Sequence, residues 1–156
     1  PNLSDFTYNN DDAKRREVAL GDLVTVGDVG YQDADGYVFL CDRKRDMIIS
    51  GGVNIYPAEI ESVLIQMPGV RDCAVFGIPD DEFGEQICAY VEPAPPAPGA
   101  AAIDAIAVRQ YLGQHVARYK VPKVVEFSPA LPREDSGKIF KRKLRAPYWE
   151  KAGRSI

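Results

Sequence analysis

The sequence predicts an α/β domain of the α+β type, in which helices pack on a small mixed sheet that follows a β-hairpin. At 156 residues the chain is long enough to bury a core of its own. Hydrophobic residues make up 46% of it and charged residues 27%, a balance typical of folded globular proteins. Strand-like and helix-like segments alternate without internal repeats, which favours one layered fold.

The hairpin is predicted near the start of the chain. Residues 23–33, LVTVGDVGYQD, and residues 36–42, GYVFLCD, are rich in β-branched and aromatic side chains. They are joined through Ala34, Asp35 and Gly36, the short Asp-Gly type of turn expected between paired strands. The two runs are therefore expected to pair in antiparallel fashion.

A short buried strand is expected at residues 47–49, before a turn at Gly51 and Gly52 that needs unusual backbone angles or close approach of a ligand. Pro57 suits the first turn of a helix, which residues 68–69 would end. Apolar residues in this helix follow an i, i+3, i+4, i+7 spacing at Ile60, Val63, Leu64 and Met67. The side chains expected to face water are Glu59, Glu61 and Gln66.

The rest of the chain continues the alternation of strands and helices. Proline has no amide donor, so the segment PAPPAPGAAA cannot continue a strand ladder and predicts a stiff linker. The expected elements are strands at 70–79 and 85–93 around an acidic loop, the linker at 93–102, a helix at 103–118, a strand within 121–132, and a short basic helix at about 139–143.

Charge and cysteine content narrow the classes of function. The net charge of −4 gives the whole chain no attraction for polyanions, although five basic residues crowd its C-terminal end: Lys138, Lys141, Arg142, Lys143 and Arg145. Cys41, Cys73 and Cys88 form no CxxC pair, which supports neither a disulfide framework nor a metal site and favours a reducing cytoplasm. No apolar run reaches the length of a membrane span. The abrupt start without methionine suggests a fragment of a longer protein.

Lys138, in the segment PREDSGKIFKR, has three possible roles. A phosphate loop would need glycine and Ser or Thr where this chain has Pro132 and Ile139, so that reading fails. The basic residues around Lys138 could bind nucleic acid, or they could form a solvated terminal helix. The third role is a single charge brought into an active site. Asp28 supports it, because a carboxylate at a strand end can accept hydrogen bonds from ribose hydroxyls.

Three consecutive blocks of sequence carry a family resemblance. They are GDVGYQDADGYVFLCDRKRDMIISGGVNIYPAEIE, then GIPDDEFGE, then PREDSGKIFKR. In this order they resemble the C-terminal motifs of the adenylate-forming enzymes, the superfamily of acyl-CoA synthetases, peptide-synthetase adenylation domains and luciferases. The resemblance covers nearly all of the chain from about Gly21 to Leu144.

The resemblance implies a role for each matching residue. Asp28 would bind the ribose hydroxyls of ATP and Arg43 would support the same ribose, while Asp42 falls on the hinge between two domains. Gly51, with Gly52, falls in the loop that lines the pantetheine channel. Lys138 would be the catalytic lysine of adenylation, carried on a flexible Ser-Gly turn. It also resembles lysines whose acetylation silences such enzymes, because acetylation removes the charge.

The same resemblance implies the domain organisation and the reaction. Residues 1–42 would be the end of a large N-terminal domain with the hinge, and residues 43–156 the mobile C-terminal domain. The expected enzyme is an AMP-forming acid–thiol ligase that uses ATP with Mg²⁺ to convert a fatty acid or another carboxylate to an acyl-AMP, and then CoA to form the acyl-CoA. This fragment alone should be inactive, because the phosphate loop and the acyl pocket lie elsewhere. The alternative is a non-catalytic module that binds nucleic acid or a protein through its basic end.

A few positions depart from the family pattern or have simpler explanations. Val26 stands where the family commonly has threonine, and Val53 where some members have a polar residue, so two supplementary contacts are unassigned. His115 is expected at a helix end as a surface or capping residue. Tyr148 and Trp149 are expected either to pack the C-terminal tail or to dock on another domain.

Overall fold

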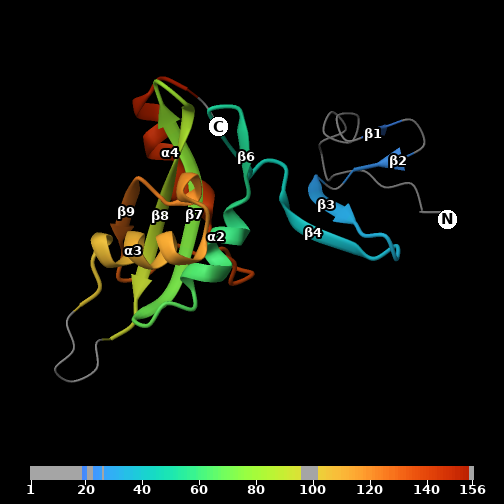
Figure 1. Ribbon diagram of the computed structural model, residues 1–156. Helices are drawn as coiled ribbons and strands as arrows, with labels where there is room; N and C mark the ends of the chain where they lie inside the picture. Colours follow the sequence, from blue (N-terminus) through green and yellow to red (C-terminus); the bar gives the residue numbers. More distant parts are fainter. Residues whose placement is uncertain (1–18, 21–22, 26, 96–101, 155–156) are drawn as a thin grey trace. The chain divides into compact units, whose positions relative to one another are not determined.

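Two compact units make up the chain, Pro1–Arg45 and Asp46–Ile156. The computed structural model describes residues 19–20, 23–25, 27–95 and 102–154 (Figure 1). The proline-rich linker lies largely outside this described part, as does Val26. Among the described helices, none is long and apolar enough to cross a membrane.

The described residues of the first unit form two antiparallel pairs of strands: β1 (Ala19–Leu20) with β2 (Leu23–Val24), and β3 (Asp28–Gln32) with β4 (Val38–Arg43). The expected hairpin is confirmed in β3 and β4, but the prediction of one continuous first strand over 23–33 is wrong. Gly27 has a φ of 80°, a backbone conformation that ends one strand and redirects the chain into the next. At the turn, the Asp33 carboxylate accepts the N–H groups of Asp35 and Tyr37.

The second unit is built on a five-stranded sheet in the order β6-β5-β8-β7, with β9 parallel to β8. Its strands are β5 (Ile48–Ser50), β6 (Val53–Ile55), β7 (Val70–Asp80), β8 (Gly84–Pro93) and β9 (Val124–Phe127). The strands predicted at 70–79 and 85–93 are confirmed as β7 and β8, which pair along their whole length. Both are apolar on both faces because helices cover both sides of this ladder.

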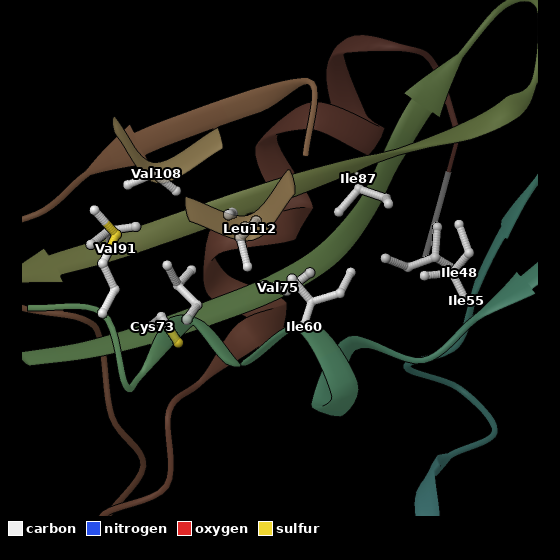
Figure 2. Packing of buried hydrophobic residues seen from close by; sticks show 12 residues of the cluster. Ile48, Ile55, Ile60, Cys73, Val75, Ile87, Val91, Val108 and Leu112 are labelled. Atoms are coloured by element: carbon white, nitrogen blue, oxygen red, sulfur yellow. The ribbon is translucent and has the colours of Figure 1, made fainter. Parts of the chain in front are cut away.

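One face of the ladder packs against α2 (Pro57–Leu64) and α3 (Ala105–His115). Side chains of alternate residues in β7 and β8 point to this face, and Figure 2 shows them meeting the helices. The core consists of Ile48, Ile55, Ile60, Leu64, Met67, Cys73, Val75, Ile87, Ala89, Val91, Val108 and Leu112. The predicted apolar spacing of α2 is confirmed, since Ile60 and Leu64 are fully buried. Asp104 caps α3 by accepting the Ala107 N–H at 2.7 Å.

The other face packs against α4 (Lys141–Lys151), which Figure 1 shows behind the sheet. The smaller core there is formed by Phe76, Ile78 and Cys88 with Tyr90, Val124, Leu144 and Tyr148. The prediction of a short basic helix at 139–143 is wrong, because α4 continues to Lys151. The apolar side chains of its later turns, Leu144 and Tyr148, pack against this core. Packing thereby extends the helix through Pro147, despite the amide that proline lacks.

Candidate functional site

In the first unit, Asp28 and Arg43 are directly opposite each other in the β3–β4 ladder. Asp28 opens β3, Arg43 closes β4, and both are exposed to solvent. The next residue, Lys44, donates its N–H to the Gly27 carbonyl at 2.7 Å, which continues the pairing beyond the strand ends. The fold thus brings together two candidate nucleotide-binding residues that lie far apart in sequence.

Asp42, the expected hinge residue, lies one position before Arg43 in β4 and is half-buried. Its carboxylate accepts the N–H of Arg43 at 2.8 Å. The boundary between the two compact units falls between Arg45 and Asp46, three residues further along the chain. Asp42 therefore belongs to the last strand before this boundary.

Gly51 and Gly52 form the tight turn between β5 and β6 with φ values of 58° and 80°. The Gly51 N–H donates to the Phe83 carbonyl at 2.8 Å, so the turn is tied to the loop between β7 and β8. A Cβ at Gly51 would lie 3.0 Å from Cδ1 of the Phe83 ring, whereas one at Gly52 would meet open space. Gly51 is thus required both by its backbone angles and by its neighbour.

The loop that receives Gly51 is itself organised by Asp80. The Asp80 carboxylate accepts the N–H groups of Phe83 at 2.9 Å and Glu82 at 3.1 Å. It also pairs with Lys123 at 3.6 Å. The hydrogen bond from Phe83 is the main reason that the pKa of Asp80 lies below its ordinary value. The backbone around Gly51 is therefore held in a defined position.

Lys138 is exposed on a small hairpin between β9 and α4. Gly137 N–H donates to the Glu134 carbonyl and Glu134 N–H donates to the Lys138 carbonyl, both at 2.8 Å. Gly137 has a φ of 83°, so the loop is a three-residue turn ending in a left-handed glycine. The flexible Ser-Gly turn expected from sequence is instead hydrogen-bonded. Within the described part of the chain, the Lys138 ammonium makes no hydrogen bond or ion pair.

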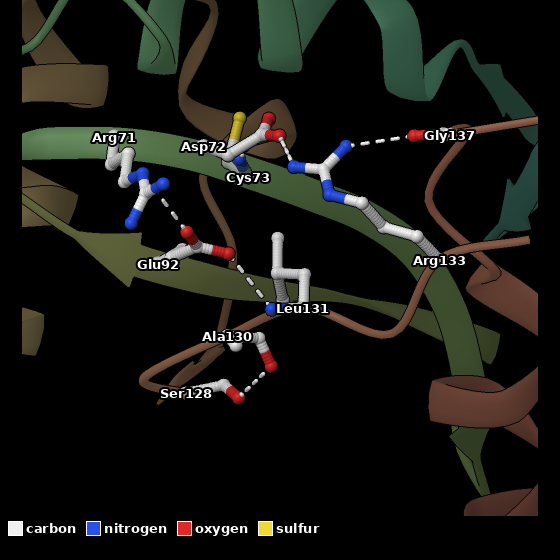
Figure 3. Close-up of polar contacts among 9 residues, drawn as sticks. All are labelled: Arg71, Asp72, Cys73, Glu92, Ser128, Ala130, Leu131, Arg133 and Gly137. Carbon is white, nitrogen blue, oxygen red and sulfur yellow. Dashed lines mark hydrogen bonds and ion pairs between the residues drawn. The ribbon is translucent and has the colours of Figure 1, made fainter.

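The segment that leads to this hairpin is fixed to the sheet (Figure 3). Glu92, buried in β8, accepts the Leu131 N–H at 2.8 Å, and Arg71 lies 3.3 Å from its other oxygen. Arg133 donates from Nη1 to the Gly137 carbonyl at 2.9 Å and pairs through Nη2 with Asp72 of β7. The base and the tip of the hairpin are thus both anchored.

The two candidate loops are attached at opposite ends of the β7–β8 ladder. The Gly51 turn joins it where Ser50 pairs with Gly84. The Lys138 hairpin joins it at Asp72 and Glu92, which pair with each other near the far end. From Gly84 to Glu92 a strand advances about 26 Å, so one small ligand cannot touch both loops in a fixed domain.

Two of the five clustered basic residues are paired with carboxylates. Lys141 lies 2.8 Å from Glu61, and Arg145 lies 3.8 Å from Glu85. Burial raises the pKa of Glu85, while Arg145 opposes that effect. The prediction that Glu61 faces water is wrong, because its carboxylate also accepts the Val75 N–H at 2.6 Å. These pairs weaken the cationic surface that a nucleic-acid site would need.

The other residues noted in the sequence, His115, Tyr148 and Trp149, make packing contacts or hydrogen bonds within the second unit. His115 ends α3 and contacts its own helix, with Nδ1 2.7 Å from the Tyr111 carbonyl. Trp149 donates from Nε1 to the Gly77 carbonyl and Tyr148 bonds with Tyr90, which confirms that they pack the tail.

No cluster of three metal-ligating side chains occurs among the described residues. Burial raises the pKa of Cys73 to about 12, which does not suit a nucleophile.

Comparison with known proteins identifies the fold. The model of the AMP-binding enzyme C-terminal domain family matches residues 59–138, from α2 to the candidate lysine. This chain belongs to that family. The adenylate-forming fold expected from the motifs is therefore confirmed for the second unit.

The relatives of this AMP-binding C-terminal domain include acyl-CoA ligases and related ligases. A long-chain-fatty-acid–CoA ligase of Mycobacterium tuberculosis is 47% identical over 122 residues, which are 78% of this chain and 23% of that protein. A feruloyl-CoA synthase of Amycolatopsis is 50% identical over 78% of this chain and 24% of its own length. ATP-bound MatB from Rhodopseudomonas palustris superposes with a TM-score of 0.76 at 40% identity, covering 86% of this chain and 26% of that structure. The chain thus spans about a quarter of the length of each of these relatives.

Sequence reasoning missed the residues that hold the site in place. Arg133 lies in the PREDSGKIFKR motif, but its partner Asp72 is 61 residues away. Glu92 and Leu131 are 39 residues apart. A charged residue inside the apolar run of β8 was the one available signal for Glu92, because a buried carboxylate needs partners.

Proposed function

We propose that this chain is the C-terminal part of an ATP-dependent acyl-CoA synthetase. Residues 1–42 would complete a large N-terminal domain and its hinge, and residues 43–156 would form the mobile domain. The observation that carries the proposal is Lys138, a cation that has no ion-pair partner among the described residues and is held on an anchored hairpin. The Gly51 turn at the opposite end of the ladder supports it, because two reaction steps would then use two separate surfaces.

The first step would join a carboxylate to the α-phosphate of ATP and release pyrophosphate. Two anions approach each other in this step, and negative charge builds on the phosphoryl and bridging oxygens. The Lys138 ammonium would offset that charge. Asp28 would accept hydrogen bonds from the ribose hydroxyls, and Arg43 would contact the same ribose. Their directly opposing positions in the β3–β4 ladder would place the carboxylate and the cation side by side for this. Mg²⁺ would accompany the ATP phosphates, held mainly outside this chain.

The second step would transfer the acyl group from AMP to the thiol of CoA. For this step the domain would turn about Asp42, withdrawing Lys138 and bringing up the turn at Gly51 and Gly52. Gly52 has open space where a side chain would stand, which suits close passage of a pantetheine arm. The acids named by the relatives, long-chain fatty acids and ferulate, are the first substrates to try.

The test compares the two half-reactions in the intact enzyme that contains this chain. Lys138→Ala should slow ATP–pyrophosphate exchange by about 10²–10³-fold and leave thioester formation from a supplied acyl-adenylate unchanged. Lys143→Ala is the control, since Lys143 is equally cationic, exposed, and five residues away. Equal loss of both half-reactions would count against the assigned role. Salt-dependent binding of the 156-residue chain to DNA or RNA would favour the alternative of a binding module instead.

Regulation by a lysine acetyltransferase is a second part of the proposal. The Lys138 side chain is exposed at the tip of a hairpin, where another enzyme can reach it, and acetylation would remove its charge. A cytoplasmic location would suit both this partner and the free thiols of the three cysteines. Mass spectrometry of the protein from cells that never detects acetyl-Lys138 would argue against this regulation.

A further inference from the structure

The Lys138 hairpin is too small to keep its shape unaided. It has one isolated antiparallel bridge, between Arg133 and Ile139, two backbone hydrogen bonds within the turn, and one at its base from the Phe140 N–H to the Pro132 carbonyl. Short two-stranded hairpins are marginally stable in water, so contacts with the sheet must fix the conformation and position of this one. The side chain that makes those contacts at the tip is that of Arg133.

We propose that Arg133 is a positioning residue that sets the location of the Lys138 ammonium by clamping the hairpin to Asp72 at the edge of the sheet. The proposal rests on the proposed role of Lys138. The Arg133 guanidinium donates from Nη1 to the Gly137 carbonyl, directly before Lys138, and from Nη2 to Asp72 (Figure 3). One planar group thus joins the residue beside the lysine to β7.

Asp72 provides a fixed end for this clamp. Its Oδ2 pairs with Arg133, while its Oδ1 accepts the N–H of Cys73 at 2.8 Å. Asp72 pairs in the ladder with Glu92, and the buried Glu92 carboxylate accepts the Leu131 N–H. Leu131 is itself 4% exposed. The chain is therefore held at Leu131 and again at Gly137, which leaves Lys138 little freedom except in its own side chain.

The geometry distinguishes a clamp from a second catalytic cation. The Arg133 charge is already paired with a carboxylate, so it adds little field at a phosphate. Two differently directed N–H groups are in use, and a lysine ammonium does not reproduce that planar fork. A displacement of about 1 Å at a reacting group can cost up to about 10²-fold in rate. Loss of the clamp should therefore slow adenylation without touching the substrate.

The first experiment measures the hairpin itself in the 156-residue chain. Arg133→Ala and Asp72→Asn should each raise hydrogen exchange at the Glu134 and Gly137 amides about tenfold or more, because those amides are bonded only within the turn. Exchange in α3 should not change. Unchanged exchange at Glu134 and Gly137 in both variants would overturn the clamp.

The second experiment measures the two half-reactions in the intact enzyme. Arg133→Ala and Asp72→Asn should each lower kcat for ATP–pyrophosphate exchange about tenfold, with thioester formation from a supplied acyl-adenylate unaffected. The double variant should be no slower than either single one, because both remove the same contact. Arg133→Lys should recover little. Arg142→Gln, which removes an exposed charge that has no partner among the described residues, should behave as wild type.

The outcomes separate the clamp from the role of Lys138. If Lys138→Ala slows pyrophosphate exchange but neither Arg133→Ala nor Asp72→Asn does, the clamp is wrong and the catalytic lysine stands. If Arg133→Ala slows both half-reactions equally, Arg133 has a general structural role and the clamp is also overturned. If Lys138→Ala itself has no effect, the proposed function of Lys138 fails and the clamp fails with it.

Discussion

Asp28 and Arg43 occupy directly opposing positions of the β3–β4 ladder, at the first residue of one strand and the last residue of the other. In the intact enzyme, Asp28→Ala should raise KM for ATP about tenfold with a smaller change in kcat, because the proposed ribose contact would be made both before and during the reaction. Arg43→Ala should act in the same direction.

The matched control for this prediction is Asp35→Asn, at the tip of the same hairpin. It changes an exposed carboxylate of the same unit, and KM for ATP should stay at the wild-type value. A steady-state titration of ATP at saturating acid and CoA measures all three variants. An unchanged KM in Asp28→Ala would contradict the assignment of this carboxylate to the nucleotide.

Glu61 connects three elements, and its removal should destabilise the second unit. Its carboxylate accepts the Val75 N–H at the outer edge of β7 and pairs with Lys141 at the start of α4. Glu61→Ala removes the carboxylate from the amide of buried Val75 and from the half-buried Lys141 ammonium, and it should lower the free energy of unfolding by about 1–3 kcal/mol. Glu61→Gln, which keeps an acceptor for Val75, should cost less.

Urea unfolding of the 156-residue chain measures this effect. Glu59→Ala is the comparison, because Glu59 pairs with Lys120 at 2.6 Å on the surface of the same helix. The Glu59 side chain of this pair is 45% exposed, and a surface ion pair contributes about 0–1 kcal/mol. Equal destabilisation by the two alanine variants would show that Glu61 is an ordinary surface residue.

The cysteines should differ sharply in reactivity. Burial raises the pKa of both Cys73 and Cys88 to about 12, so at pH 8 about one such thiol in ten thousand is ionised. Cys41 is only partly buried. Iodoacetamide should therefore label Cys41 first in the folded chain and all three cysteines in guanidinium chloride. Mass spectrometry that finds Cys73 or Cys88 labelled as fast as Cys41 in the folded chain would contradict this.

The predictable parts of the fold are those whose type can be inferred from the pattern of neighbouring residues in the sequence. β7 and β8 are continuous apolar runs between turn residues, and α2 has a regular apolar spacing after Pro57. The full length of α4 was not predictable, because its first turn is basic and Pro147 interrupts it. The surface formed by β7, β8 and β9 explains why the helix continues, and its residues lie 20 to 72 positions before Leu144 and Tyr148.

The candidate site divides in the same way. Asp28, Arg43, Gly51 and Lys138 lie in motifs that a sequence reader can recognise in order. The residues that hold them in place cannot be recognised in this way, because each contacts a segment that is distant in sequence and that only the folded sheet brings near. Glu61 occupies a helix position that spacing assigns to water, yet the edge of β7 lies within reach of its carboxylate. Neither helical periodicity nor charge pattern contains that information.

Gly51 should matter for thioester formation and not for adenylation. Its φ of 58° is unfavourable for residues with a side chain, and an added Cβ would press on the Phe83 ring. In the intact enzyme, Gly51→Ala should slow acyl transfer from a supplied acyl-adenylate to CoA about tenfold or more. ATP–pyrophosphate exchange should stay near the wild-type rate, since Lys138 is attached at the far end of the ladder.

Gly113→Ala is the control for a glycine substitution in the same unit. Gly113 lies inside α3 with open space around the position of a Cβ, so alanine there should stabilise the helix by about 0.5–1 kcal/mol and leave both half-reactions unchanged. Thermal unfolding of each variant separates loss of the fold from loss of a step. If Gly51→Ala slows both half-reactions in proportion, the turn supports the domain as a whole and the two ends of the ladder do not serve separate steps.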